Sequence, residues 1–242
     1  MIRLLSIVTW ILFSTMPTYG QTPAPLKPVR QLLINAKLSS VVEVPLYFKL
    51  LQVNLGAGES SAYLGANAMI YPTSGSLIVE SEGESKTAQD GDCAFVAAGK
   101  TATLRAAAGH AATFLQFILV PAAELTRAPN GKPAAVTVLY QTPEAIKELK
   151  PGPYEFTMTR VTAPPKAPAP PMHHRSGAAL YYVLSGSGLL KMVDKAEPRA
   201  RGSIQYEPQD FIHSWQNAGD GPMILLQANI SPEGTPEIVF LP

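Results

Sequence analysis

Short apolar runs alternate with clusters of glycine, proline and aspartate along most of the chain. The run at residues 48–53 (FKLLQV) ends before Gly56, and the run at residues 156–161 (FTMTRV) ends before Pro164. Runs of this length that close on turn residues are typical of β-strands. The sequence contains 18 glycines and 23 prolines, and proline is roughly twice as frequent as its average of about 5%. The pattern predicts an all-β protein of the sandwich or barrel kind.

The second half of the chain repeats the plan of the first half. Three pairs of runs match in order and character: 48–53 with 156–161, 70–77 with 181–188, and 114–119 with 223–228. The offsets are 108, 111 and about 110 residues, and a near-constant offset indicates a duplicated unit of one-domain size. We expect a first unit at residues 21–122, which includes lead-in strands within residues 29–51, and a second unit at residues 153–242.

A connecting segment is predicted at residues 123–152. Residues 142–144 (Thr-Pro-Glu) have the order of an N-cap, a first helical residue and an acidic first turn. Lys150 stands near the end of this pattern, and the Pro-Gly pair at residues 151–152 stops it. The sequence therefore predicts a short helix between the two units.

The first 20 residues have the pattern of a secretory signal peptide. Arg3 precedes an apolar run at residues 4–13, and the small residues Thr18 and Gly20 occupy the −3 and −1 positions of a cut after Gly20. The apolar run is half as long as the roughly 20 residues that span a bilayer. We expect an exported protein, periplasmic or secreted, with no membrane attachment after cleavage. A retained N-terminal tether is the alternative.

Charge and cysteine content narrow the choice of partners. Without residues 1–20 the chain has 18 basic and 18 acidic residues. A neutral chain with scattered charges gives no reason to expect a nucleic acid or an anionic membrane as partner. Cys93 is the only cysteine, so no disulfide can form within the chain. Its apolar neighbours favour a role in packing.

The residues with the most specific chemistry lie in two blocks of the second unit. Residues 171–186 read PMHHRSGAALYYVLSG, and residues 202–217 read GSIQYEPQDFIHSWQN. These blocks resemble the two motifs of the cupin family, a small antiparallel β-barrel that usually holds one divalent metal. The family's first motif has His-x-His and then Glu three residues before Tyr-Val-Leu-x-Gly. Its second motif has Gly, five residues, Pro-x-Gly, two residues, His, three residues and Asn. Together with the repeat, the resemblance implies a bicupin: two tandem double-stranded β-helix (jelly-roll) barrels with a short connecting helix.

The resemblance places four metal-ligand positions in the second unit, at His173, Arg175, Ala179 and His213. Two of them have lost ligating ability, because a guanidinium stays charged and a methyl group has no donor atom. Side chains alternate along a strand, so His173 and Arg175 should face one way and His174 the other. In the first unit the same positions hold Ala62, Leu64, Ala68 and Ala94. That unit is expected to be structural, or to bind something apolar.

Two hypotheses for the second unit stay open. In the first, the unit binds a small polar molecule, with a carboxylate as the favoured group. Arg175 offers a bidentate fork, and Tyr182 or its neighbour Tyr181, together with Trp215, supplies walls.

In the second hypothesis, a bulge turns His174 inward, so that His173, His174 and His213 hold one divalent metal, either iron, manganese or zinc. Glu207 is a further candidate ligand if its strand turns it inward. The resemblance then implies a metal-dependent enzyme of the oxygenase or isomerase type. No catalytic residue can be assigned. Pairing through barrel edges, which is common in the family, makes a homodimer a further expectation.

Overall fold

The computed structural model describes residues 27–41, 45–126 and 134–241. Within these ranges the regular elements are strands and one short 3₁₀ turn, η1 at Ala122–Glu124, so the all-β prediction is confirmed. None of the helical structure in the described part of the chain is long and apolar enough to cross a membrane. The predicted signal peptide lies outside the described residues.

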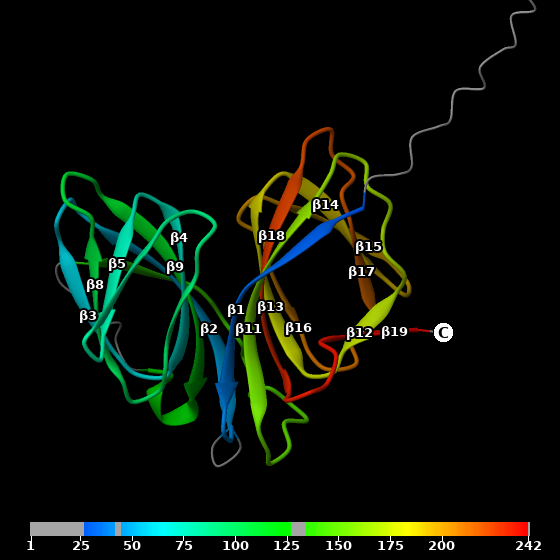
Figure 1. The fold of residues 1–242 in the computed structure, drawn as a ribbon. Coiled ribbons are helices and arrows are strands. Elements are labelled where there is room, and N and C mark those ends of the chain that lie inside the picture. Colours follow the sequence, from blue (N-terminus) through cyan, green and yellow to red (C-terminus); the bar gives the residue numbers. More distant parts are fainter. Residues whose placement is uncertain (1–26, 42–44, 127–133, 242) are drawn as a thin grey trace, which may run out of the picture.

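The first barrel, on the left in Figure 1, consists of two sheets. Its strands are β2 Leu46–Leu55, β3 Ser60–Leu64, β4 Asn67–Ser74, β5 Leu77–Ser81, β6 Glu84–Ala88, β7 Ala94–Val96, β8 Thr101–Ala106, β9 Ala112–Pro121 and β10 Ala135–Gln141. One sheet has the order β10-β2-β9-β4-β7, and the other has the order β3-β8-β5-β6.

The second barrel, on the right in Figure 1, has the same plan. Its strands are β1 Val29–Leu38, β11 Tyr154–Ala163, β12 His173–Arg175, β13 Ala178–Ser185, β14 Ser187–Met192, β15 Ala196–Ala200, β16 Ile204–Glu207, β17 His213–Gln216, β18 Met223–Pro232 and β19 Ile238–Phe240. The sheets have the orders β1-β11-β18-β13-β16 and β15-β14-β17-β12-β19. Because β11, β13 and β18 begin 108, 111 and 111 residues after β2, β4 and β9, the predicted repeat is confirmed.

The two barrels exchange their outermost strands, which the sequence did not indicate. Strand β1 pairs with β11, from Val29 opposite Thr162 to Leu38 opposite Tyr154. The lead-in segment therefore completes the second barrel, and its assignment to the first unit is wrong. Strand β10, predicted as linker, pairs with β2 and completes the first barrel. An apolar alternation shows that a strand exists, but it does not show which open sheet edge the strand will join.

The predicted position of the connecting helix is also wrong. Residues 142–152 form bends and turns, and the helical turn in the described part of the connection is η1. Thr142, predicted as an N-cap, is buried and bonds instead to β2. Its Oγ1 accepts a hydrogen bond from the Phe48 amide at 3.1 Å, and its own amide donates to the Phe48 carbonyl at 3.0 Å. Pairing with the strand takes the backbone groups that a helix would need.

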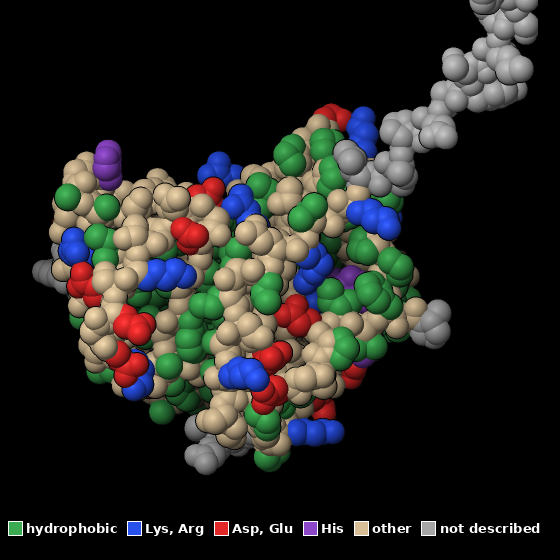
Figure 2. All heavy atoms as spheres, viewed as in Figure 1, with side chains coloured by type: hydrophobic (Ala, Val, Ile, Leu, Met, Phe, Trp, Pro, Cys, Tyr) green, Lys and Arg blue, Asp and Glu red, His purple; other side chains and the backbone are tan. Residues whose placement is uncertain are grey.

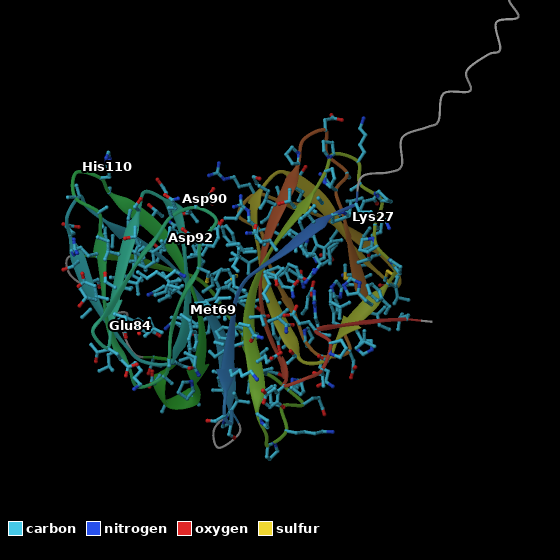
Figure 3. The ribbon with its side chains drawn as sticks, viewed as in Figure 1. Lys27, Met69, Glu84, Asp90, Asp92 and His110 are labelled. Carbon is cyan, nitrogen blue, oxygen red and sulfur yellow. The ribbon has the colours of Figure 1, made fainter. Side chains whose placement is uncertain are left out.

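An apolar core joins the two barrels. Alternate residues of the central strands point out of each barrel and meet those of the other barrel. Phe156 of β11 packs with its ring centroid 6.4 Å from that of Phe48 and 6.5 Å from that of Phe95, both in the first barrel. Met69, also buried in this core, lies between the barrels in Figure 3. The central strands are therefore largely buried on both faces, because one face lines a barrel and the other forms the joint.

The interiors of the two barrels differ in polarity. In the first barrel the inward residues of β9 and β2 include Phe114, Ile118, Val120 and Leu51, all buried in one apolar cluster. The repeat places Leu225, Asn229, Ser231 and Thr159 at the corresponding positions of the second barrel, and the last three are buried polar residues. The first barrel is filled with apolar side chains, as expected for a structural unit. The second has a polar end.

We predict that Phe156→Ala destabilises the whole molecule by about 3–5 kcal/mol, because it removes a fully buried ring at the joint. Urea unfolding followed by circular dichroism measures the change. Val138→Ala, at a position that is 49% exposed, is the control and should change the free energy of unfolding by less than about 0.5 kcal/mol. A loss confined to one barrel, seen as a separate early transition, would contradict a shared core.

Candidate functional site

The polar end of the second barrel brings together side chains from β12, β16 and β17. His173 of β12 lies opposite His213 of β17 in the strand register. His173 and Arg175 are alternate residues of β12 and both turn inward, where they are 5% and 0% exposed. His174 between them faces outward, with Nδ1 3.3 Å from Oδ1 of Asp210. The predicted alternation is confirmed, and the bulge that would have turned His174 inward is absent from β12.

A buried ion pair occupies the centre of this cluster. Arg175 Nε donates to Oε2 of Glu207 at 3.0 Å, and both side chains are fully buried. Trp215 Nε1 donates to the other carboxylate oxygen, Oε1, at 2.9 Å. His213 Nε2 lies 2.9 Å from the same Oε1 but is not aligned to form a hydrogen bond with it. The carboxylate of Glu207 is therefore surrounded by positive and hydrogen-bond-donating groups.

The electrostatic balance keeps this pair charged. Burial lowers the pKa of Arg175, while Glu207 opposes that shift. Burial alone raises the pKa of Glu207, but Arg175, His213 and Trp215 together outweigh it and hold the pKa below its ordinary value. Each charge is stable in the interior because the other lies beside it.

The two inward imidazoles have fixed orientations. His173 Nδ1 lies 3.0 Å from the carbonyl oxygen of Pro171, and His213 Nδ1 lies 2.8 Å from that of Phe211. Their ring centroids are 4.5 Å apart. Burial lowers the pKa of His173 to about 4, and the nearby His213 and Arg175 act in the same direction. His173 is therefore neutral near pH 7, with Nδ1 as the donor.

The residues of this cluster do not fit the divalent metal that the family resemblance implies. Among the described residues, no group of three or more His, Cys, Asp or Glu side chains is placed to hold a metal ion. The two imidazoles have a suitable donor type, but both oxygens of Glu207 already accept hydrogen bonds. Arg175 adds a positive charge that would repel a cation in this buried setting. The third imidazole of the metal hypothesis, His174, faces outward.

A cavity of ≈ 430 Å³ lies beside the cluster. Its walls are mainly apolar and come from both sheets of the second barrel. The Tyr181 and Trp215 rings stack with centroids 5.4 Å apart. The lining residues are Lys27, Pro28, Arg30, Val161, Ala163, Pro168, Ala169, Pro170, Pro171, His173, Tyr181, Trp215, Met223, Leu225, Ile238 and Phe240. Figure 2 shows apolar side chains with histidine among them on the right-hand barrel.

Strand β1 brings positive charge to this cavity. Arg30 on β1 donates from Nη2 to Oε1 of Gln227 at 2.9 Å and lies 3.5 Å from a carboxylate oxygen of Glu237. Burial lowers the pKa of Arg30, and Glu237 opposes that shift. Lys27 lies where the described chain enters the second barrel in Figure 3. The exchanged strand and the residues just before it therefore supply both the lysine and the arginine of the described cavity lining.

A hydrogen-bond chain links Arg30 to the buried ion pair. Arg175 Nη2 donates to the hydroxyl of Tyr181, which donates to Oε1 of Gln227 at 3.0 Å. Gln227 also accepts from Arg30. The polar groups at the cavity and the charges behind it thus form one network.

The predicted wall residue Tyr182 is misplaced. It packs against the core between the barrels, and Tyr181 lines the cavity instead. The error is one residue, which on a strand moves a side chain to the opposite face. Trp215 lies in the cavity wall as expected, but Arg175 is tied to Glu207 behind that wall.

Sequence reasoning missed Arg30 and Gln227. Gln227 has a signal, because it interrupts the apolar run of β18. Arg30 has none, because its place depends on the strand exchange.

A family model describing the cupin domain matches residues 159–228, which contain both sequence blocks of the second barrel. The second barrel is therefore a cupin domain. The paired barrels of this cupin also match solved structures over most of the chain, which supports its bicupin architecture. No curated protein matches the sequence.

Three of these structures illustrate the likeness of fold. Oxalate decarboxylase from Bacillus subtilis, studied for its Mn(II) centres, has a TM-score of 0.56 at 14% identity, over 93% of this chain and 82% of that one. The formate complex of Lactobacillus farciminis oxalate decarboxylase has a TM-score of 0.57 at 14% identity, over 92% and 90%. A putative glyoxylate-induced protein from Pseudomonas aeruginosa has a TM-score of 0.54 at 16% identity, over 90% and 85%. At identities this low, the likeness shows a shared fold alone.

We predict that Glu207→Gln destabilises the protein by about 3–5 kcal/mol, because it leaves the buried guanidinium of Arg175 without its counter-charge. Chemical unfolding at pH 7 measures the effect. Glu197→Gln is the matched control, because Glu197 pairs with Lys195 and Arg199 at the surface. This control should leave the unfolding midpoint nearly unchanged. Equal effects of the two substitutions would contradict a buried, charged pair.

A second prediction concerns the loss of stability at acidic pH. The folded state keeps His173 neutral down to about pH 4, whereas the unfolded chain takes up a proton near pH 6.5. His173 therefore makes stability fall as the pH decreases from about 6.5 to 4. In His173→Gln, the free energy of unfolding should depend less steeply on pH across this window. An unchanged slope would show that His173 has the same pKa in the folded and the unfolded chain.

Proposed function

We propose that this bicupin is exported and that its second barrel binds a small molecule with an apolar body and one anionic group, with a carboxylate favoured. The ≈ 430 Å³ cavity beside Arg30 is the observation that carries the proposal. Its volume lies within the range of small-molecule sites, about 300–1,000 Å³. The pattern of residues 1–20 supports export.

The cavity walls favour an apolar ligand body. The lining is mainly apolar and includes Trp215, Tyr181, Met223, Leu225 and Phe240. Burying apolar surface against such walls contributes about 25 cal/mol per Å². A doubly charged ligand without apolar surface, such as the oxalate named for the similar structures, would lose its hydration here and gain little packing. The similarity of fold therefore does not imply that this chain binds oxalate.

The anionic group is assigned to Arg30. Arg175, the carboxylate-binding residue predicted from sequence, already bonds to Glu207 and Tyr181 and has no exposed surface. Arg30 retains 39% exposure of its side chain and lines the cavity. A guanidinium pairs with a carboxylate through two parallel hydrogen bonds. His173 also lines the cavity, and because its ring is neutral it neither repels an anion nor needs one as a counter-charge.

The alternative of a metal-dependent enzyme draws its support from the similar structures, one of which is named for Mn(II) centres. In this chain the support is limited to the two inward imidazoles. The charge of Arg175 argues against it, as does the Glu207 carboxylate, which is already bonded to Arg175 and Trp215. We therefore propose a binding protein whose action on the ligand does not depend on a metal.

The proposal is tested by the fluorescence of Trp215. The full chain has two tryptophans, and Trp10 lies in the predicted signal peptide. In a chain that begins at Gln21, Trp215 in the cavity wall is therefore the single reporter. Octanoate should change its emission saturably. Octanoate should also bind about tenfold more tightly than octanol, because a charge-assisted hydrogen bond contributes about 1.5–3 kcal/mol. Equal affinity for octylamine, or saturable binding of oxalate alone, would contradict the proposed ligand class.

We predict that Arg30→Gln weakens octanoate binding about tenfold and leaves octanol binding unchanged. Glutamine keeps a polar group on β1 but cannot pair with an anion. Arg105→Gln is the control, because Arg105 pairs with Glu80 on the first barrel and should not affect either ligand. Loss of octanol binding in Arg30→Gln would indicate a collapsed cavity and not a lost charge.

A further inference from the structure

We infer that the Arg175–Glu207 pair takes the structural place of the metal in this barrel: a fixed internal cation stands where cupins hold an exchangeable one. The family resemblance places two ligands at positions 175 and 179. Arg175 occupies the first position, and the second is Ala179. Ala179 lies directly opposite Glu207 in the pairing of β13 with β16. A carboxylate absent from one strand is thus present on the neighbouring strand, one ladder step away.

The pair connects strands of both sheets around a positive centre. Arg175 belongs to β12, Glu207 to β16 and Trp215 to β17, and the chain of hydrogen bonds continues through Tyr181 to Gln227 on β18. A metal in the same barrel would tie its ligand strands together in the same way. His173 and His213 flank the pair, with their Nδ1 atoms held by backbone carbonyls. That backbone anchoring is typical of metal-ligating histidines. The two histidines that remain of the four ligand positions are therefore still held in fixed orientations.

The first barrel shows that the fold does not itself require a charge here. The residue opposite Ala68, at the ladder position equivalent to Glu207, is Val96. Val96 is buried in an apolar cluster. Cation and carboxylate therefore occur together in the second barrel and are both absent from the corresponding places in the first.

This arrangement has a chemical consequence. A guanidinium does not deprotonate, change oxidation state or exchange ligands. The centre can therefore hold strands and orient the Tyr181 hydroxyl, but it cannot open a coordination position. The inference also predicts that one substitution, Arg175→His, returns a metal site, because it removes the cation, frees Oε2 of Glu207 and adds a third inward imidazole. Three imidazoles and one carboxylate suit divalent first-row metals.

The test adds Mn²⁺, Co²⁺ or Zn²⁺ to the full chain and measures binding by calorimetry and by the visible absorption of Co²⁺. The native chain should bind none of them stoichiometrically. Arg175→His should bind one equivalent of Co²⁺ at least about 100-fold more tightly than the native chain does. Adding His213→Ala should abolish that gain in affinity. Arg175→Gln is the matched control, since it removes the charge without adding a ligand, and it should bind Co²⁺ weakly.

Two results would overturn the inference: stoichiometric metal in the native chain that is lost in His213→Ala, or a folded Arg175→His variant with no gain in affinity. If Arg175→His does not fold alone, folding on addition of Zn²⁺ supports the inference, and failure to fold with Zn²⁺ overturns the claim of a restorable site. Octanoate binding to the native chain is independent of these outcomes, so this inference and the proposed function can fail separately.

Discussion

The organisation of the second barrel depends on a buried charge that the protein must neutralise with its own atoms. Arg175 and Glu207 are both fully buried, and either one alone would be strongly unfavourable in this interior. Their pairing holds the Arg175 side chain of β12 and the Glu207 side chain of β16 toward the barrel interior. Trp215 and Tyr181 bond to the pair and are thereby placed as neighbouring walls. The shape of the cavity therefore follows from an electrostatic requirement as well as from apolar packing.

Duplication gave the two barrels one architecture, and the joint between them limits how each could diverge. The outward faces of the central strands are committed to the shared apolar core, where Phe48 and Phe156 meet. Only the inward faces are free to vary without separating the barrels. The first barrel fills its interior with residues such as Phe114 and Ile118. The second places polar groups at one end and leaves a cavity beside them, so divergence was confined to the face that can hold a ligand.

The sequence predicted those features that depend on local periodicity and spacing. The repeat, the all-β class and the meeting of His173 with His213 follow from offsets and motif spacing, which local backbone geometry preserves. Features that depend on a choice between distant partners could not be predicted. The edge joined by β1, the use of Thr142 by β2 and the place of Arg30 all result from pairing across more than 90 residues. Tyr182 was misplaced because a one-residue register error reverses a strand's faces.

The strand exchange also explains why function in this family member cannot be assigned from its cupin motifs alone. The family match begins at residue 159, whereas the cationic groups at the cavity come from residues 27–30. The polar network of the second barrel therefore closes only when β1 has crossed from the start of the described chain and paired with β11. Arg30, Gln227, Tyr181 and Arg175 then form one continuous path from the cavity to the buried pair. A barrel excised at its sequence boundaries would keep both histidines and lose the group that we propose selects the ligand.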